Sequence, residues 1–507
     1  MANWNAPSTT LPCKACGATL PPKARRNPTL AHSWRGGPKR KSLGSPVSLP
    51  PPPLFDLVIL GSGPGGYRAA VLAAQRGLRV AVIEEGIWGG CCLNRGCVPK
   101  RAWHETARSV DLTDAAQRGI QGKLTVDFVV AWQHQRHIVE RVRDSYLSFL
   151  DRLGVERIEG RGRIAAPGAV VVDDRRINAT HILIATGSHP HLPQGWPSDN
   201  PRILTTNDLF DTLPPHRGHW ALIGGGIVAV ELAYILPLLG IGVTWLCRST
   251  PLKHIPEVVR TPVLQALARR GIAPRIAPIP TPEIDNDAVR IGGECFDAVL
   301  VATGRTPNTS DLGLEHLDLE AHGPISVNER CQTAAPGVWA IGDCTPGPMT
   351  ANRAMREALT VVDAITGAAT PTKGWRNQIP TAIYSATEGA FFGPEDEALE
   401  DAGFEPAVGF VAFDVLPQAL AQGQAHGFAR LVADMDSGEV LAGQVVGEQA
   451  GELIQMLSTL PPGQALRFLA QSAVNHPSLS EIWSEVAIGM GKQWGLNPQL
   501  WGETAPD

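Results

Sequence analysis

Short apolar runs alternate with glycine-rich turns in the first part of this chain. Residues 54–60 (Leu-Phe-Asp-Leu-Val-Ile-Leu) form one run, and residues 78–83 form another. Runs of this length, partly β-branched and bounded by glycine, are typical of buried parallel strands. The segment from Tyr67 to Gln75 predicts a helix between them, so the pattern is strand, turn, helix, strand.

The first glycine turn carries chemistry as well as geometry. It reads Gly-Ser-Gly-Pro-Gly-Gly over residues 61–66, and Glu84 closes the next strand. Gly61, Gly63 and Gly66 match the dinucleotide pattern, in which glycine lets the backbone approach a pyrophosphate at a helix N-terminus. Glu84 lies where an acid accepts hydrogen bonds from a ribose; a solvated carboxylate at a strand end is the alternative.

The same pattern returns in residues 219–247. A strand over 219–223 leads into Gly224-Gly225-Gly226, then a helix that carries Glu231, then a strand over 242–247. Arg248 follows this strand, where the first unit has an acid. A cation there suits a 2′-phosphate, which favours NADP(H) over NAD(H). A solvated cation is the alternative.

This second unit is apolar enough over residues 220–246 to suggest a membrane helix. Five glycines, Glu231 and Pro237 interrupt it, so a strand, a turn, a helix and a strand fit better. We expect no transmembrane segment and no membrane partner.

Two cysteines separated by four residues lie just after the first nucleotide unit. On a regular helix, Cys92 and Cys97 would lie roughly 8–9 Å apart, whereas a disulfide requires Cα atoms within about 7 Å. A working pair therefore predicts a distorted helix start, which Asn94 and Gly96 permit. Two nucleotide sites and one such pair would give a three-part electron path. Two reduced cysteines in the core are the alternative.

Length, charge and cysteine content narrow the class of protein. A chain of 507 residues is expected to form roughly two to four domains. A net charge of −5 gives no general basic surface, so we expect no nucleic-acid partner. Nine cysteines, an odd number in a long chain, favour a reducing, cytoplasmic compartment over a secreted disulfide scaffold.

Residues 1–53 differ from the rest of the chain. They carry eight Lys and Arg, no Asp or Glu, and a run of prolines over 50–53. This composition predicts a disordered leader; an organelle transit peptide and a mis-assigned start are the alternatives. Cys13 and Cys16 form a single CxxC without a second one, so no metal site is expected.

With these motifs in place, residues 55–487 resemble the class I pyridine nucleotide-disulfide oxidoreductases. That family includes dihydrolipoyl dehydrogenase, glutathione reductase and mercuric reductase. The segments that carry the resemblance are the redox helix (89–100), the crossings between domains (184–187 and 302–308), the second flavin motif and the segment at the flavin ring (339–343 and 347–351), and parts of the interface domain (378–382, 441–447, 450–452 and 476–481).

The resemblance implies an α/β fold with two Rossmann-like dinucleotide-binding domains and a C-terminal α+β dimerisation domain. The expected parts are a leader (1–53), the first part of an FAD-binding domain with the redox disulfide (54–187), an NAD(P)-binding domain (188–305), the second part of the FAD-binding domain (306–377), the dimerisation domain (378–495) and a tail (496–507).

The resemblance also implies roles for single residues. Cys92 would meet the substrate, Cys97 would face the flavin, and His476, oriented by Glu481, would be the acid/base that a partner subunit supplies. Pro477 is expected to open the helix that carries Glu481. The other residues expected at the nucleotides are Lys100, Thr186, Gly187, Glu231, Gly304, Arg305, Asp343, Thr350 and Ala351.

Three departures from the family stand out. The family usually places Lys four residues after the second cysteine, but this chain has Arg101 there, with Lys100 before it. This puts the family's Lys–Glu pair at the flavin, which would involve Glu231, in doubt. Cys91 occupies the position before the first redox cysteine, where the family commonly has Thr. The middle of the chain resembles mercuric reductase, although no cysteine follows Trp483.

The sequence thus predicts an FAD-dependent NAD(P)(H):disulfide oxidoreductase that works as a homodimer. It is closest to dihydrolipoyl dehydrogenase, so the expected substrate is a lipoyl dithiol or disulfide. An NADPH-dependent reductase of glutathione or another small disulfide is the alternative within the enzymes, and Arg248 favours it. A flavoprotein that serves as a bound subunit or redox sensor is the alternative outside them.

Overall fold

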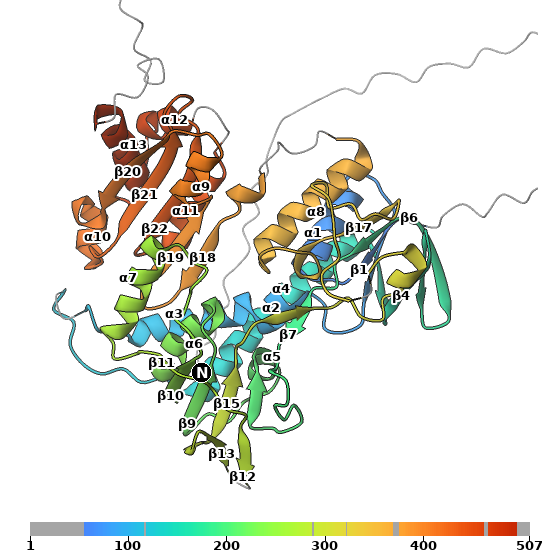
Figure 1. Ribbon diagram of the computed structural model, residues 1–507, viewed down its shortest axis with the longest axis horizontal. Helices are drawn as coiled ribbons and strands as arrows, with labels where there is room; N and C mark the ends of the chain where they lie inside the picture. Colours follow the sequence, from blue (N-terminus) through green and yellow to red (C-terminus); the bar gives the residue numbers. More distant parts are fainter. Residues whose placement is uncertain are drawn as a thin grey trace, which may run out of the picture. The chain divides into compact units, whose positions relative to one another are not determined.

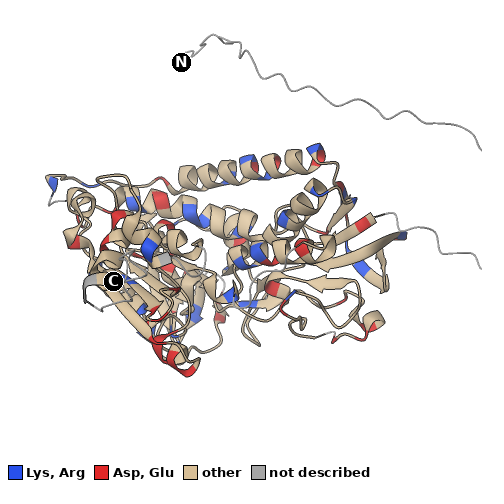
Figure 2. Ribbon diagram, turned by 90° about the horizontal axis from the view of Figure 1, so that it is seen from above, with Lys and Arg blue, Asp and Glu red and all other residues tan. Residues whose placement is uncertain are grey.

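The computed structural model describes residues 55–115, 118–285, 288–320, 322–368, 375–460 and 465–493. The leader (1–53), with Cys13 and Cys16, and the tail (496–507) lie outside these described residues. None of the described helices is long and apolar enough to span a membrane. Basic and acidic residues are interspersed along the elements of the ribbon (Figure 2).

The first large sheet contains the strand that leads into the first glycine turn (Figure 1). Its parallel strands lie in the order β3 (Glu156–Glu159), β2 (Val80–Glu84), β1 (Phe55–Leu60) and β6 (Arg175–Ile184), and β17 (Val338–Ala340) pairs with β6. Two antiparallel strands, β5 (Ala169–Val172) and β4 (Gly162–Ala166), extend it beyond β6. Helix α1 (Pro64–Gln75) packs against α8 (Ala351–Thr366), so the sheet and these helices enclose a continuous apolar core.

The second large sheet repeats the plan of the first. Its strands are all parallel and lie in the order β11 (Arg275–Ile276), β10 (Gly242–Cys247), β9 (His219–Ile223), β15 (Ala298–Val301) and β8 (Ile203–Thr205). Helix α6 (Ile227–Leu238) follows β9, just as α1 follows β1. The expected strands over 219–223 and 242–247 match β9 and β10, because both apolar runs are buried between layers of the fold.

The third large sheet is antiparallel and belongs to the C-terminal part of the chain. Its order is β18 (Thr381–Tyr384), β19 (Glu388–Phe392), β22 (Val440–Val446), β21 (Phe428–Asp434) and β20 (Pro406–Ala412). The helices packed with it are α11 (Ala450–Ser458), α12 (Ala465–Gln471) and α13 (Glu481–Gln493). Buried Trp483 on α13 donates from Nε1 to the Leu453 carbonyl at 2.9 Å, which ties two of these helices together.

Helices α2 (Gly90–Arg95), α3 (Cys97–Val110) and α4 (Phe128–Arg152) leave the first sheet after β2. The remaining described elements are α5 (Thr206–Asp211), α7 (Glu257–Ala268), α9 (Asp396–Asp401), α10 (Pro417–Gln422), β7 (Ser188–Pro190), β12 (Glu283–Asp285), β13 (Ala288–Ile291), β14 (Glu294–Phe296), β16 (Arg305–Pro307) and the 3-10 turns η2 (Leu314–Leu317), η3 (Gly342–Cys344), η4 (Trp375–Gln378) and η5 (Phe413–Val415). The expected fold class is confirmed: two Rossmann-like units and a C-terminal α+β unit.

Two helix starts differ from the expectation. Helix α1 begins at Pro64, three residues before Tyr67, because proline in the first turn lacks only an N–H that the helix would leave unpaired. The expectation that Pro477 opens a helix is wrong: residues 476–480 form a bend and a turn, and α13 begins at Glu481. An acid in the first turn suits the partial positive charge at that end of a helix.

Candidate active site

The two cysteines predicted to form the redox pair lie on either side of a break between two helices. Helix α2 carries Cys92 and ends at Arg95, Gly96 interrupts, and α3 begins at Cys97. A Cβ on Gly96 would lie 3.2 Å from the Cys91 carbonyl oxygen, so glycine allows the two helices to meet this closely. The distorted helix start that the cysteine spacing predicts is therefore confirmed.

Asn94 contributes to this break through its side chain, since its backbone is helical. Its amide nitrogen donates to the carbonyl oxygens of Trp88 and Gly90, each at 2.9 Å. A Cβ on Gly90 would come within 2.5 Å of the Gly63 Cα, so α2 packs directly on the first glycine turn. The cysteines are thereby placed beside the predicted nucleotide site.

The two thiols have unequal affinities for a proton. Both are free. The hydrogen bond with the Cys92 thiol, assisted by the charge of Lys100 and opposed by burial, lowers the pKa of Cys97 to about 7. The same hydrogen bond, together with burial, raises the pKa of Cys92 well above its usual value. At neutral pH, Cys92 therefore keeps its proton, whereas about half of Cys97 is ionised, and the thiolate fraction of Cys97 grows above pH 7.

The doubtful Lys–Glu pair forms in this chain. Lys100 Nζ contacts the carboxylate of Glu231 on α6, which is itself buried. The other Glu231 oxygen accepts a hydrogen bond from the Tyr384 amide at 2.8 Å. The residue one position earlier than the family's usual Lys therefore supplies the cation near Cys97.

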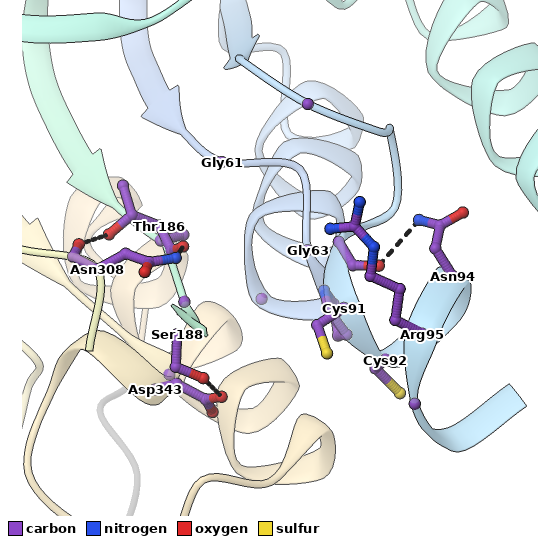
Figure 3. A pocket seen from close by; sticks show the side chains of 18 of the residues that line it. Gly61, Gly63, Cys91, Cys92, Asn94, Arg95, Thr186, Ser188, Asn308 and Asp343 are labelled. Carbon is purple, nitrogen blue, oxygen red and sulfur yellow. Dashed lines mark hydrogen bonds between the residues drawn. The ribbon is translucent and has the colours of Figure 1, made fainter. Parts of the chain in front are cut away.

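A cavity of ≈ 390 Å³ is lined by both Cys92 and Cys97. Figure 3 shows Cys92 at this cavity. The predicted site residues that line it are Gly61, Gly63, Glu84, Cys92, Cys97, Lys100, Thr186, Gly187, Arg305, Asp343 and Ala351. Cys97 is exposed toward this cavity. Residues more than two hundred positions apart thus form one site that includes the pair.

The glycine turn at one wall of the cavity is shaped for a phosphate. Gly61 approaches the Ala185 carbonyl so closely that a Cβ would lie 2.4 Å from its oxygen, and a Cβ on Gly66 would lie 2.0 Å from the Gly61 oxygen. A Cβ on Gly63 would meet no atom closer than 4.0 Å. Gly63 precedes α1 without a side-chain cap, so the first N–H groups of the helix are available to an anion.

Glu84 lies at the edge of the same cavity, as predicted. One carboxylate oxygen accepts from the Ser62 backbone N–H at 2.8 Å and from its hydroxyl at 2.7 Å. The other accepts from the Gly86 N–H at 2.9 Å. These bonds hold the carboxylate in the glycine turn, where a ribose next to the pyrophosphate would reach it.

The opposite wall holds Asp343 and the crossing from the first sheet (Figure 3). The Ser188 hydroxyl donates to Asp343 at 2.6 Å, and Arg305 donates to the same hydroxyl at 2.7 Å. Thr186 and Asn308 exchange hydrogen bonds of 2.6 and 3.0 Å between the two crossing segments. Ser188 and Asn308 were not among the predicted site residues, because a polar residue that only orients another side chain belongs to no sequence motif with a fixed spacing.

A buried arginine fixes the loop that carries Asp343. From α8, Arg353 donates to the Gly342 carbonyl at 2.6 Å and to the Pro346 carbonyl at 2.9 Å. Glu357, one turn later, accepts from the Gly342 N–H at 2.7 Å. Sequence reasoning missed this clamp, although charged residues four apart on the buried face of an amphipathic helix are a signal that could have found it.

These features fit FAD. Uncapped N–H groups at α1 suit a pyrophosphate, and Glu84 and Asp343 are acceptors for ribose and ribityl hydroxyls. Helix α8 also begins without a side-chain cap at Thr350, whose buried hydroxyl has no partner among the described residues. Ala351, the first residue of α8, lines the cavity, so this helix start would face the flavin ring.

The second glycine turn repeats the geometry of the first. A Cβ on Gly224 would lie 2.2 Å from the Ala302 oxygen, whereas Gly226 has open space and precedes α6 without a side-chain cap. Gly304 follows Ala302 as Gly187 follows Ala185. Arg248 follows β10 and is exposed, with no ion-pair partner in the described part of the chain. This turn is suited to a second dinucleotide.

His476 and Glu481 form a pair away from the cavity of their own chain. The imidazole Nδ1 lies 2.7 Å from a Glu481 oxygen, and this hydrogen bond lowers the pKa of Glu481. The Ser478 N–H donates to the other oxygen at 2.7 Å. The carboxylate accepts from Nδ1–H, which leaves Nε2 free to take a proton. The His476 side chain is 69% exposed, and neither residue lines the cavity that holds the thiols.

Comparisons with known proteins agree with this geometry. Residues 55–358 match the family described as pyridine nucleotide-disulphide oxidoreductase, and residues 379–487 match its dimerisation domain. A dihydrolipoyl dehydrogenase from Thermus scotoductus is 33% identical over 87% of this chain and 98% of its own length. A glutathione reductase from Burkholderia cepacia is 32% identical over 84% and 97%.

A solved structure, LpdA from Mycobacterium tuberculosis, has the same fold: the TM-score is 0.78, with 24% identity over 85% of this chain and 99% of that one. The family match covers both nucleotide units, the thiols and the C-terminal sheet. The chain therefore belongs to the pyridine nucleotide-disulphide oxidoreductases, as an FAD-dependent enzyme that passes electrons between a nicotinamide nucleotide and a disulfide or dithiol.

Proposed function

We propose that the enzyme oxidises a dihydrolipoyl group with NAD(P)⁺, as the dihydrolipoyl dehydrogenases do. The observation that carries the proposal is the Cys92–Cys97 pair, with its unequal pKa values, at the wall of the cavity that fits FAD. Several relatives that match most of the chain are named dihydrolipoyl dehydrogenase.

In the proposed reaction, the substrate dithiol loses two electrons and two protons. The Cys92–Cys97 disulfide gains both electrons; one proton ends on the Cys92 sulfur, and the other passes through the base to solvent because Cys97 stays a thiolate. A substrate thiolate attacks the Cys92 sulfur, which breaks the bond to Cys97 and leaves Cys97 as a thiolate. The second substrate thiolate then displaces Cys92, and the substrate leaves as a disulfide. The low pKa of Cys97 supports its role as the leaving thiolate.

Bound FAD would supply two-electron transfer between the dithiol form of the pair and the nicotinamide. Lys100 stabilises the Cys97 thiolate. Arg353 and Glu357 keep the loop of Asp343 in place, and Asp343 would bind the ribityl chain.

The substrate thiols and Cys92 need a base, because Cys92 holds its proton at neutral pH. We assign this role to His476, oriented by Glu481. The pair lies away from the cavity of its own chain, and the C-terminal region matches a dimerisation domain. A homodimer would therefore bring His476 of one subunit to Cys92 of the other.

We also place the enzyme in the cytoplasm, where reducing conditions keep its other thiols free.

An NADPH-dependent reductase of glutathione or another small disulfide is the second candidate. Arg248 favours it, since an exposed cation after β10 suits a 2′-phosphate. The match to a glutathione reductase along most of the chain points the same way.

A panel of assays separates these candidates. The purified holoenzyme is tested with dihydrolipoamide, lipoamide, oxidised glutathione and mercuric ion, each with NAD(H) and NADP(H). We expect the highest kcat/KM with the lipoyl substrates. A clear preference for glutathione with NADPH would favour the second candidate. No turnover with any pair, in protein that carries FAD, would point to a bound subunit or a redox sensor.

A further inference from the structure

Helix α3 connects the redox thiols to the C-terminal sheet. It begins at Cys97, and three basic or imidazole side chains on its successive turns contact residues of that sheet region. These side chains are Arg101, His104 and Arg108. A shift of the C-terminal sheet would therefore be transmitted to the helix whose first residue is the flavin-facing cysteine.

Arg101 makes the first of these contacts. Its Nη1 donates to the Glu388 carboxylate at 3.1 Å, and the guanidinium lies 4.2 Å above the Tyr384 ring. A planar cation on an aromatic face with a carboxylate partner is held in both position and orientation. Because Lys100 takes the contact with Glu231, Arg101 is free for this second role.

Glu388 is the centre of the contact. Its side chain is only 5% exposed, at the first residue of β19, and Arg108 Nη1 lies 4.0 Å from the same oxygen that Arg101 binds. Its second oxygen lies 3.5 Å from the Gly451 N–H. Arg108 also binds Glu448 at 2.5 Å. Arg101 also contacts Glu105 on the next turn of α3 at 3.0 Å. The buried Glu388 carboxylate beside two arginines therefore docks α3 on β19, and each arginine has a second carboxylate partner.

His104 adds a neutral contact to the same segment. Burial lowers its pKa to about 4, so it is uncharged at neutral pH. Its Nε2–H donates to the Ser385 carbonyl at 3.2 Å, which leaves Nδ1 to accept from Arg101 at 3.4 Å. Residues 384–388 thus contact α3 through both a charged and a neutral partner.

The same segment also reaches the cation beside the thiols, because the Tyr384 N–H binds the Glu231 that pairs with Lys100. We propose that Arg101 and Glu388 are positioning residues that set the thiolate environment of Cys97 by docking α3 on the C-terminal sheet. Neither touches a reacting atom. The proposal uses the role of Cys97 from the proposed function, but it does not depend on which disulfide is the substrate.

The test measures the titration of Cys97 itself. In a Cys92→Ser background, reduced holoenzyme is alkylated with iodoacetamide at a series of pH values. Trypsin cleaves after Arg95 and Lys100, so Cys97 is quantified by mass spectrometry on a peptide without Cys91. Glu388→Gln keeps the side-chain volume and removes the charge. Asp396→Asn is the control, since it breaks an ion pair with Arg430 within the C-terminal region without contacting α3.

We expect Glu388→Gln to raise the apparent pKa of Cys97 by about half a unit or more, because release of α3 would weaken the contact of Cys97 with the charge of Lys100. This is about threefold less thiolate below the midpoint. The loss of the carboxylate charge alone would lower the pKa instead, so a downward shift would also contradict the proposal. Arg101→Lys should also raise the pKa of Cys97, with a smaller shift, and Asp396→Asn should leave the titration unchanged. Sedimentation and thermal unfolding show whether each variant is a folded dimer. If Glu388→Gln does not fold, Arg101→Lys decides alone.

A Cys97 titration that stays at the value of the Cys92→Ser parent in a folded Glu388→Gln or Arg101→Lys variant would overturn the proposal, and would leave the pair with a purely structural role. Failure of the wild type to turn over lipoyl substrates would count against the proposed function only, because alkylation needs no turnover.

Discussion

The reactivity of Cys92 and of Cys97 depends on which of the two thiols keeps its proton. Two adjacent thiols in one cavity repel each other's negative charges, so ionisation of one raises the pKa of the other. The hydrogen bond from the Cys92 thiol, assisted by a cation near Cys97, favours ionisation of Cys97. Lys100 supplies this cation, and its own charge is balanced by Glu231.

Replacement of Lys100 by Met should raise the pKa of Cys97. The thiolate then loses its nearest cation and gains an unbalanced carboxylate nearby, and an opposite charge at this range is worth about one to three pKa units. In reduced holoenzyme, the long-wavelength absorbance band of a thiolate next to the flavin should thus appear only at higher pH than in the wild type. A pH titration of the long-wavelength band measures this shift.

The double variant Lys100→Met with Glu231→Gln is the control. It removes both charges, so the midpoint should lie between those of the wild type and the single variant. A single variant that titrates at the wild-type pH would show that Lys100 does not set the charge of Cys97.

Within the strand–glycine–helix unit, glycine is required for two different reasons. Gly61 and Gly66 allow backbone segments to approach, whereas Gly63 has open space and faces the cavity. In this motif, two glycines are therefore needed for backbone packing, and one glycine leaves space for the bound nucleotide.

Two alanine substitutions should separate these two requirements. Gly63→Ala should fold normally and lose FAD affinity, since its Cβ meets no protein atom within 4.0 Å but occupies space at the start of α1. Gly66→Ala should destabilise the fold, because its Cβ would lie 2.0 Å from the Gly61 oxygen. Thermal unfolding of FAD-free protein and fluorescence titration with FAD measure the two effects.

The opposite pattern, with Gly63→Ala unfolded or with Gly66→Ala as stable as the wild type, would contradict this division. Gly226→Ala in the second turn provides a matched comparison. Its Cβ also has open space, so this variant should retain FAD and weaken only the binding of the nicotinamide nucleotide.

The elements that the sequence predicted well are those whose signal is local. The strands over 219–223 and 242–247 and the break at Gly96 follow from apolar runs and from residue spacing. The start of α13 was misplaced, because proline signals only where a helix can begin. The contact of Arg101 with Glu388 joins segments that are 287 positions apart, so no local pattern could reveal it.

For the whole molecule, the central feature is a site whose parts lie in different places on one chain. The thiols line the cavity, whereas His476 and Glu481 lie elsewhere in the C-terminal region. A twofold dimer would build two equivalent sites from two chains.

Mixing two inactive variants should therefore restore activity. A Cys92→Ser chain and a His476→Gln chain are mixed under conditions that allow subunit exchange. A heterodimer then has one site with both lesions and one with neither, so dihydrolipoamide oxidation should return. The mixture reaches at most about a quarter of wild-type activity, if half of the dimers are mixed and each has one intact site.

Heterodimers that are shown to form and yet stay inactive would mean that the histidine serves its own chain. Each variant exchanged with itself is the control, and neither should gain activity.

The most direct test of the account is the absorbance of the holoenzyme after reduction by two electrons. A Cys97 thiolate beside FAD should give a long-wavelength band that grows with pH around a midpoint near 7. Cys97→Ser should abolish this band, and Cys92→Ser should keep it. Equal behaviour of the two variants, or freshly purified folded protein without flavin, would contradict the account.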